Sequence, residues 1–388
     1  MKTNNNIPAY RFQGYTDAWE LRKLGEVADV FDGTHQTPRY TNQGVMFLSV
    51  EDINTLESEK YISSEDFEKE FKIFPEFNDV LMTRIGDIGT SNIVKTNDEI
   101  AYYVSLALIK PKKLESHFLN SIIQSKDFQN ELWKRTLHIA FPKKINKGEI
   151  SEINLMFPTL PEQEAIGTFF STLDRQITLH QRKLDTLKEQ KKTYLKLLFP
   201  AKGQTKPALR FQGFEDDWEE VKLGDVVNIQ KGTQRGKQEI SEIQSEQFPY
   251  PVYNGGQNVS GYTDEYNREN MVIISEGGAS AGYVNYYSGK FWSGGHNFSI
   301  DNLDNNLLYI KSILEFNQQK LYELKVGSGL PNVQLGSINQ FTILLPSLPE
   351  QEAIGTFFQT LDQEMAQVEV KLACLKEMKK TLLRKLFV

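Results

Sequence analysis

The chain has 388 residues, of which 39% are hydrophobic and 24% are charged, and its formal net charge at pH 7 is −7. This length allows two or three domains, and the composition is that of an ordinary globular protein. The acidic total argues against a protein that binds nucleic acid over its whole surface, because contacts to phosphate require Lys and Arg.

The polar N-terminus, MKTNNNIPAY, lacks the apolar core of a signal peptide, and no other apolar stretch is long enough to span a bilayer. The single cysteine, Cys374, has no partner for an internal disulfide, and we expect it to pack within a helical apolar stripe. These features favour a cytoplasmic protein.

The sequence contains two copies of one pattern. A leading segment, PAYRFQGYTDAWELRKLGEV at 8–27, returns as PALRFQGFEDDWEEVKLGDV at 207–226. Eleven residues, LPEQEAIGTFF, stand unchanged at 160–170 and 348–358. The two repeats are offset by 199 and 188 residues, so the second middle region is 11 residues shorter. Constant ends around an altered middle indicate a retained scaffold that carries an exchanged segment.

The middle regions, 28–157 and 228–346, mix short β-rich runs with helical stretches. The runs at 45–48 and 271–274 are typical strands, and 118–135 and 306–325 are typical helices. We therefore expect two tandem globular α+β domains. The predicted boundaries are 1–157 for the first domain, 158–200 for a first long helix, 201–346 for a linker and second domain, and 347–388 for a second long helix.

Each LPEQEAIG motif opens a long helix, with Pro161 and Pro349 in the first turn. Apolar residues then recur at alternating spacings of four and three over more than four heptads, which indicates a coiled coil. The predicted seam residues are Ile166, Phe170, Leu173, Ile177, Leu184, Leu187 and Leu198 in the first helix, and Ile354, Phe358, Leu361, Met365, Leu372, Leu375 and Leu386 in the second.

Two matched seams in one chain favour mutual pairing of the two helices; the alternative is that each helix packs on its own domain. Lys191 and Lys379 interrupt the two seams at equivalent positions. We expect these lysines to extend their ammonium groups into solvent, or else to face a partner.

Catalytic signatures are few. The chain has no phosphate-binding loop of the G-x-x-x-x-G-K-[ST] type and no G-x-S-x-G motif, and its five histidines lack the spacing of metal ligands. Glu323 and Lys325 form the E-x-K fragment of some nucleases, which chance explains well in a chain rich in both residues. We predict no catalytic residue, no metal site and no cofactor bound by this chain.

The ordered motifs resemble the specificity subunit of type I restriction–modification systems. The resemblance rests on the paired segments from Phe12 to Gly25 and from Phe211 to Gly224, and on the paired LPEQEAI helices. It also rests on glycine turns within DVLMTRIGDIGTSNIV (79–94) and MVIISEGGASAGYVNYY (271–287), and on FWSGGHNFSI (291–300) and VGSGLPNVQLGSINQFTILLPSLPEQ (326–351). The first copy departs from the family at 136–163, where FPKK replaces Gly-Ser-Gly.

This resemblance implies a non-catalytic subunit in which each middle region is a target recognition domain that reads half of a split DNA site. The two long helices would pair as an antiparallel coiled coil with pseudo-twofold symmetry and set the distance between the half-sites. Two modification subunits that carry S-adenosylmethionine would dock on the helices, and restriction subunits would supply ATP- and Mg-dependent translocation and cleavage. The assembled complex would be an adenine-specific DNA methyltransferase and a site-specific endonuclease.

Loops of the middle regions offer side chains suited to base edges and phosphates. The predicted DNA contacts are Thr34, His35, Gln36, Arg39, Arg84, Lys143 and Lys144 in the first copy, and Thr233, Gln234, Arg235, Lys237, Asn254, Gln257 and Asn258 in the second. Ordinary solvated turns and ion pairs remain the alternative for each residue. For the whole chain the alternatives are a tandem ligand-binding scaffold without DNA specificity, or a nuclease that uses Glu323 and Lys325.

Overall fold

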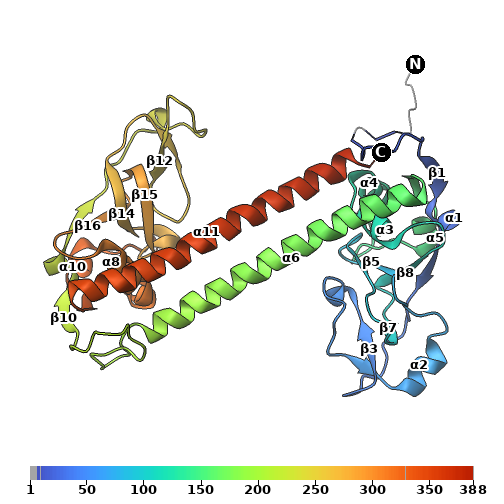
Figure 1. Ribbon diagram of the computed structural model, residues 1–388, viewed down its shortest axis with the longest axis horizontal. Helices are drawn as coiled ribbons and strands as arrows, with labels where there is room; N and C mark the ends of the chain where they lie inside the picture. Colours follow the sequence, from blue (N-terminus) through green and yellow to red (C-terminus); the bar gives the residue numbers. More distant parts are fainter. Residues whose placement is uncertain (1–6, 9, 328, 388) are drawn as a thin grey trace. The chain divides into compact units, whose positions relative to one another are not determined.

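The computed structural model describes residues 7–8, 10–327 and 329–387. It divides into two compact units: unit 1 comprises 1–181 and 370–388, and unit 2 comprises 182–369. Each unit contains one α+β domain and parts of both long helices (Figure 1). The predicted α+β class is confirmed, but the compact units do not follow the predicted boundaries, because each helix contributes residues to both units. No helix in the described part of the chain has the length and apolarity needed to cross a membrane.

Unit 1 is built on two small sheets. An antiparallel four-stranded sheet has the order β2-β8-β5-β6, and a three-stranded sheet has the order β4-β3-β7, in which β3 runs parallel to β7. The strands are β2 (Ala28–Asp32), β3 (Val45–Leu48), β4 (Tyr61–Ile62), β5 (Val80–Thr83), β6 (Ser91–Ile93), β7 (Ile100–Tyr102) and β8 (Leu106–Pro111).

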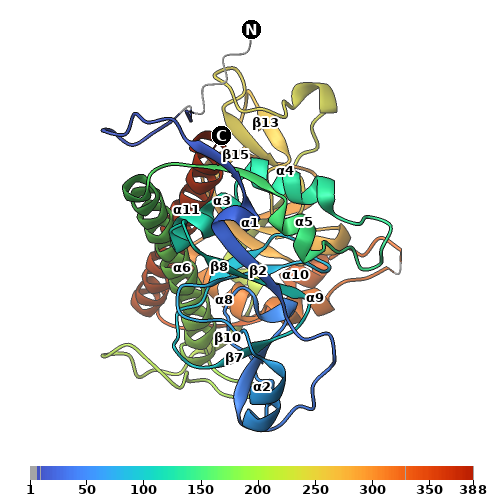
Figure 2. The same ribbon diagram turned by 90° about the vertical axis from the view of Figure 1, so that its right-hand side faces the viewer.

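Short helices cover these sheets. Helix α3 packs on β5 and β6, and α5 packs on β2 (Figure 2). The helices are α1 (Leu24–Val27), η1 (Val50–Asp52), α2 (Ser64–Glu70), α3 (Ser116–Ile123), α4 (Lys126–Arg135) and α5 (Lys147–Ser151). Ser63 and Ser125 cap α2 and α4 by accepting hydrogen bonds from backbone N–H groups of the first turn.

Unit 2 repeats the architecture in one six-stranded sheet of order β11-β16-β14-β15-β12-β13. The ten-residue strand β15 pairs with β14 through its first part and runs parallel to β12 at its end. Its elements are β11 (Val227–Lys231), η2 (Lys237–Glu239), β12 (Tyr250–Tyr253), β13 (Gly261–Thr263), β14 (Arg268–Ser275), η3 (Gly278–Ser280), β15 (Val284–Ser293), β16 (Asn297–Asn302), α8 (Leu307–Phe316), α9 (Gln318–Glu323) and α10 (Leu335–Asn339).

The leading segment of each copy forms a strand that pairs with the strand just before the long helix. In unit 1, β1 (Glu20–Lys23) pairs antiparallel with β9 (Asn154–Phe157). In unit 2, β10 (Glu219–Lys222) pairs with β17 (Thr342–Leu345) and leads into α7 (Leu223–Val226). The first and last parts of each repeat are therefore one structural piece, which explains why they share a sequence pattern while the middle differs.

The repeated LPEQ motif fixes this piece to the helix start. Glu162 is fully buried and receives two hydrogen bonds from the guanidinium of Arg11, at 2.7 and 2.6 Å. Glu350 accepts the same pair from Arg210, both at 2.7 Å. Bidentate charge-assisted bonds of this kind are strong and directional. These partners lie 151 and 140 residues apart, beyond the reach of any local pattern.

The glycine of the motif permits the long helix to approach a neighbouring short helix closely. A Cβ on Gly167 would lie 2.8 Å from the backbone nitrogen of Phe118 at the start of α3, and one on Gly355 would lie 2.9 Å from that of Tyr309 at the start of α8. No side chain fits at either position without displacing backbone. Intramolecular contacts thus account for much of the identity between the two copies of LPEQEAIGTFF.

The long helices are α6 (Leu160–Leu197) and α11 (Leu348–Lys385). In unit 1 the start of α6 packs with the end of α11, through Phe170 and Leu173 against Leu375 and Leu386. In unit 2 the end of α6 packs with the start of α11, where Leu198 joins the same core as Ile354 and Phe358. The pairing is antiparallel in each unit, which confirms the prediction.

Most predicted seam residues are buried, and Ile177, Leu361 and Met365 are half-buried. The prediction for Cys374 is wrong, because its side chain is exposed. Position 374 lies two residues from the seam position Leu372, which turns it by roughly 200° around the helix axis.

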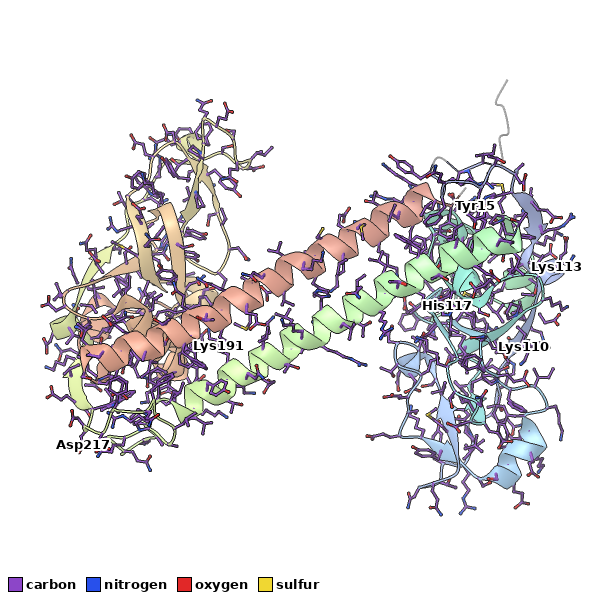
Figure 3. The ribbon with its side chains drawn as sticks, in the orientation of Figure 1. Tyr15, Lys110, Lys113, His117, Lys191 and Asp217 are labelled. Carbon is purple, nitrogen blue, oxygen red and sulfur yellow. The ribbon has the colours of Figure 1, made fainter. Side chains whose placement is uncertain are left out.

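The two seam lysines are bound within the protein instead of extending into solvent, which corrects the expectation. Lys191 (Figure 3) lies between Glu315 and Asp362, with ammonium–carboxylate distances of 2.8 and 2.7 Å. Lys379 occupies the equivalent position and pairs with Asp174, the repeat counterpart of Asp362. Burial lowers the pKa of Lys191, but the two carboxylates raise it more, so the net shift is upward. Such reciprocal pairs favour the antiparallel register.

Candidate nucleic-acid interface

A Gly-Thr loop follows β2 in unit 1 and β11 in unit 2, at equivalent places in the two repeats. A Cβ on Gly33 would lie 2.4 Å from the carbonyl oxygen of Tyr102, and one on Gly232 would lie 2.1 Å from that of Gly294. The backbone N–H of the following threonine donates to the carbonyl of Tyr102 in unit 1 and of Ser293 in unit 2. The glycine therefore lets two backbone segments pass close to each other, and we call this contact the Gly-Thr crossing. The crossing holds the residues that follow it at the edge of the sheet.

The residues after this crossing differ between the units and are mostly accessible. His35, Gln36 and Arg39 are exposed in unit 1, and Thr233, Gln234 and Lys237 are exposed in unit 2, whereas Thr34 is half-buried. Gln234 also lies against Gly295 in the neighbouring loop. A shared backbone arrangement followed by different polar side chains suits two domains that recognise different base sequences.

Arg84 has a different environment from the one predicted. Its side chain is buried, ion-pairs with Asp32 and donates to the carbonyl of Ile145 at 2.9 Å. It ties together the ends of β2 and β5 and the segment before α5. Arg84 is thus a structural side chain, and we leave it out of the proposed interface.

Arg235 is similarly engaged. Its guanidinium lies 4.6 Å from the centre of the Trp292 ring and pairs with Asp264 and Glu265 at 2.6 and 3.3 Å. Trp292 in turn donates to the carbonyl of Thr233. These contacts order the loop that presents Thr233 and Gln234. Arg235 therefore positions this loop, and its guanidinium is not free to donate hydrogen bonds to DNA.

The polar loop that contains Asn254, Gln257 and Asn258 lies next to the Gly-Thr loop of unit 2. Gln257 and Asn258 are exposed, while the Oδ1 atom of Asn254 is buried without a hydrogen-bond partner among the described residues. A Cβ on Gly294 would meet that oxygen at 2.3 Å, which places Asn254 against the loop that crosses Gly232. The structure therefore brings Thr233, Gln234 and Asn254 together around the segment 293–295.

Ion pairs separate the basic patches of the sequence into two kinds. Lys110 binds Glu76 and Asp79, and Lys112 binds Asp29, so the patch that ends at Lys113 (Figure 3) is largely neutralised. Burial lowers the pKa of Lys110, but its carboxylate partners raise it more. Lys231 likewise binds Glu276.

By contrast, Lys143, Lys144 and Lys147 form no ion pair within the described part of the chain, and Lys143 and Lys144 are exposed. The Lys143 ammonium lies 4.8 Å from the centre of the Trp133 ring, a contact that the sequence motifs did not reveal. Lys143 and Lys144 therefore retain free charge for phosphate.

The E-x-K fragment shows no feature of a nuclease site. Glu323 is exposed at the end of α9, and the Lys325 ammonium lies over the ring of Tyr322 at 4.4 Å. No group of three potential acidic, histidine or cysteine ligands is found in residues 7–8, 10–327 and 329–387.

Comparison with known proteins gives a consistent match over both copies. A family model described as the type I restriction modification DNA specificity domain matches residues 16–189 and 215–374. The specificity subunit of the type I restriction enzyme MjaIX from Methanocaldococcus jannaschii is 21% identical over 412 aligned positions, which cover 95% of this chain and 92% of that protein. A protein from Mycoplasma genitalium that is named as a type I specificity subunit is 23% identical over 291 residues, covering 73% of each chain.

A solved structure shows the same fold. The crystal structure of the type I restriction–modification S subunit from M. genitalium superposes with a TM-score of 0.78 at 18% identity, and the match covers 98% of this chain and 99% of that one.

Proposed function

The chain belongs to the type I restriction–modification DNA specificity family, and on this premise we propose that each unit reads one half of a bipartite site in duplex DNA. As a specificity subunit it confers sequence specificity and is not itself catalytic. The family model and the relatives named above do not support a tandem ligand-binding scaffold without DNA specificity.

The observation that supports this proposal most directly is that a Gly-Thr crossing lies at the edge of the sheet in both units. Both Gly-Thr crossings are held by the same backbone hydrogen bond, yet the exposed side chains beyond them differ. We assign base contacts to Thr34, His35, Gln36 and Arg39 in unit 1 and to Thr233, Gln234, Asn254, Gln257 and Asn258 in unit 2. Lys143, Lys144 and Lys237 would bind phosphates, which position the protein without specifying sequence.

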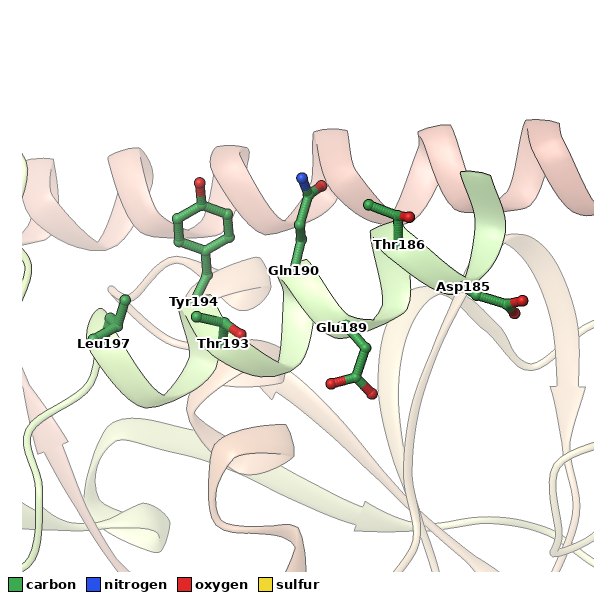
Figure 4. Close-up of a pocket in the computed structure, with 7 residues that line it drawn as sticks. All are labelled: Asp185, Thr186, Glu189, Gln190, Thr193, Tyr194 and Leu197. Carbon is green, nitrogen blue, oxygen red and sulfur yellow. The ribbon is translucent and has the colours of Figure 1, made fainter. Parts of the chain in front are cut away.

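The long helices are the proposed spacer and docking surface. A continuous 38-residue helix is about 57 Å long at 1.5 Å per residue, which suits a separation of several base pairs between half-sites. An open hollow on α6 is lined by Asp185, Thr186, Glu189, Gln190, Thr193, Tyr194 and Leu197 (Figure 4). We place a modification subunit there, one of two in the complex, with S-adenosylmethionine bound to those subunits.

Restriction subunits would add ATP- and Mg-dependent activity to the same assembly, and a cytoplasmic location follows from a role on the genome. The acidic total of the chain is compatible with this function, because base reading uses local loops and partner subunits can supply much of the phosphate binding.

Exchange of one reading region tests the proposal. Replacement of residues 28–157 by the corresponding region of another family member should change one half of the methylated site and leave the other half and the gap unchanged. The chimera is assembled with its modification subunits, and the methylated motif is determined by per-base sequencing. The reciprocal exchange of 228–346 is the matched control, and a change in both halves after either exchange would contradict independent reading.

A further inference from the structure

The loop from Leu137 to Lys144 in unit 1 presents apolar side chains entirely to solvent. Ile139 and Phe141 have relative exposures of 99% and 103%, which are among the highest for large hydrophobic residues in the described chain. The two side chains stand close together in sequence and leave much apolar surface in water, which is unfavourable unless the surface is covered in the working state.

The base of this loop is fixed to the domain. The N–H of Leu137 donates to the carbonyl of Lys144 at 2.8 Å, and the N–H of Gly86 donates to that of Lys143, also at 2.8 Å. The N–H of Ile145 then donates to the carbonyl of Arg84 at 3.0 Å. The loop is thus anchored to the glycine turn after β5, on the side where β2 ends and the Gly-Thr crossing begins.

The charges around the loop favour an anionic partner. Lys143, Lys144 and Lys147 carry no ion pair in the described chain, and residues 136–148 contain no Asp or Glu. Trp133 broadens the apolar surface, because its exposed ring lies tilted against that of His138, at a centroid distance of 4.1 Å, and lies beneath Lys143. Apolar tips beside unneutralised cations match a DNA groove lined by phosphates.

We propose that this loop is an apolar wedge that enters the minor groove beside the half-site read by unit 1. Ile139 and Phe141 contact and partly unstack one base step, while Lys143 and Lys144 bind the flanking phosphates. Apolar side chains inserted at base steps distort the duplex, and the sequence-dependent cost of that distortion contributes to specificity. The inference rests on the proposed function, because it assumes that unit 1 binds duplex DNA.

Unit 2 offers an internal comparison. Its corresponding loop is closed by the same type of bond, from the N–H of Val326 to the carbonyl of Asn332 at 2.8 Å, and Gly278 donates to the carbonyl of Pro331. Leu330 is 80% exposed, but Pro331 and Asn332 stand where unit 1 has two lysines. The cationic wedge is therefore a property of unit 1, and its effect should be confined to one half-site.

The test uses the chain assembled with its modification subunits and a duplex that contains its mapped methylation site. 2-Aminopurine is placed in turn at each position in and beside the two half-sites. Adenine methyltransferases extrude their target base, so fluorescence is expected to rise at the target adenine of each half-site. Binding by the unchanged assembly should also raise fluorescence at one further step near the half-site of unit 1. The double substitution Ile139→Ala and Phe141→Ala should abolish this increase and weaken binding about tenfold, a difference of about 1.4 kcal/mol.

Phe77→Ala is the matched control, because Phe77 is 52% exposed in the same unit at the opposite end of β5, beside Glu76 and Asp79. It should retain both the affinity and the signal. Circular dichroism and assembly with modification subunits should be unchanged in all variants.

Three results would overturn the wedge. The double variant could bind with full affinity and signal, or it could fail to assemble, which would make the loop a protein interface. Alternatively, the unchanged assembly could show no preference for the mapped duplex, in which case the proposed function fails together with the wedge. The first two results leave reading by unit 1 intact.

Discussion

Glu162→Ala should lower the free energy of unfolding of unit 1 by about 3–5 kcal/mol, which is the usual cost of breaking a buried ion pair by removing one partner. The carboxylate is fully buried and holds the Arg11 guanidinium, whose side chain is 11% exposed. The substitution leaves that cation with two unsatisfied donors and releases the leading segment from the start of α6. Hydrogen exchange with mass spectrometry measures the loss of protection in each unit separately.

Glu164→Ala is the control for this prediction. Glu164 stands in the same helical turn but is exposed, so its removal should change the stability by less than about 0.5 kcal/mol. Glu350→Ala should reproduce the loss in unit 2 by freeing Arg210. An equal, small effect of Glu162→Ala and Glu164→Ala would show that the buried pair is not what joins the domain to the helix.

Phe387→Ala should destabilise unit 1 by about 3–5 kcal/mol, although residue 387 follows the second long helix of the chain. Its ring lies 5.8 Å from those of both Phe118 and Phe170 and 6.2 Å from that of Trp19. Phe199 has the equivalent role in unit 2, where it packs against Trp218, Tyr309 and Phe358. The end of each helix thus completes the core of the domain that belongs to the other sequence repeat.

Matched substitutions separate this role from a general effect on the helices. Phe199→Ala should destabilise unit 2 and spare unit 1, in the opposite sense to Phe387→Ala. Val370→Ala in α11 should be nearly neutral, because Val370 is 72% exposed and Ala has the higher helix propensity. Urea unfolding followed by hydrogen exchange gives the free energy of unfolding of each unit. If either phenylalanine substitution lowered this free energy equally in both units, the assignment of each phenylalanine to one core would be wrong.

Local sequence patterns were sufficient for the elements whose burial follows a fixed period. The alternating spacing of four and three identified the seam from Ile166 to Leu198 because successive turns of one helix face the same neighbour. The repeated leading segments marked the two domains for a related reason: β1 and β10 pair with the strands just before the helices.

The side chains that the sequence placed wrongly have partners far away in the chain. Arg84 pairs with Asp32, 52 residues earlier, and Lys379 pairs with Asp174 on the other long helix. A charged residue in a polar loop has the same local signature whether it is free or neutralised. The exposure of Phe141 was not predicted for a different reason, because apolar residues close together in a sequence usually suggest burial.

The most direct test of the central claim is per-base methylation mapping of the host genome with and without this gene. The account predicts that one bipartite motif, with two short half-sites separated by an unread gap, loses its adenine methylation when the gene is deleted and regains it when the gene is restored. If no split motif changes, this chain does not supply sequence specificity to a modification complex.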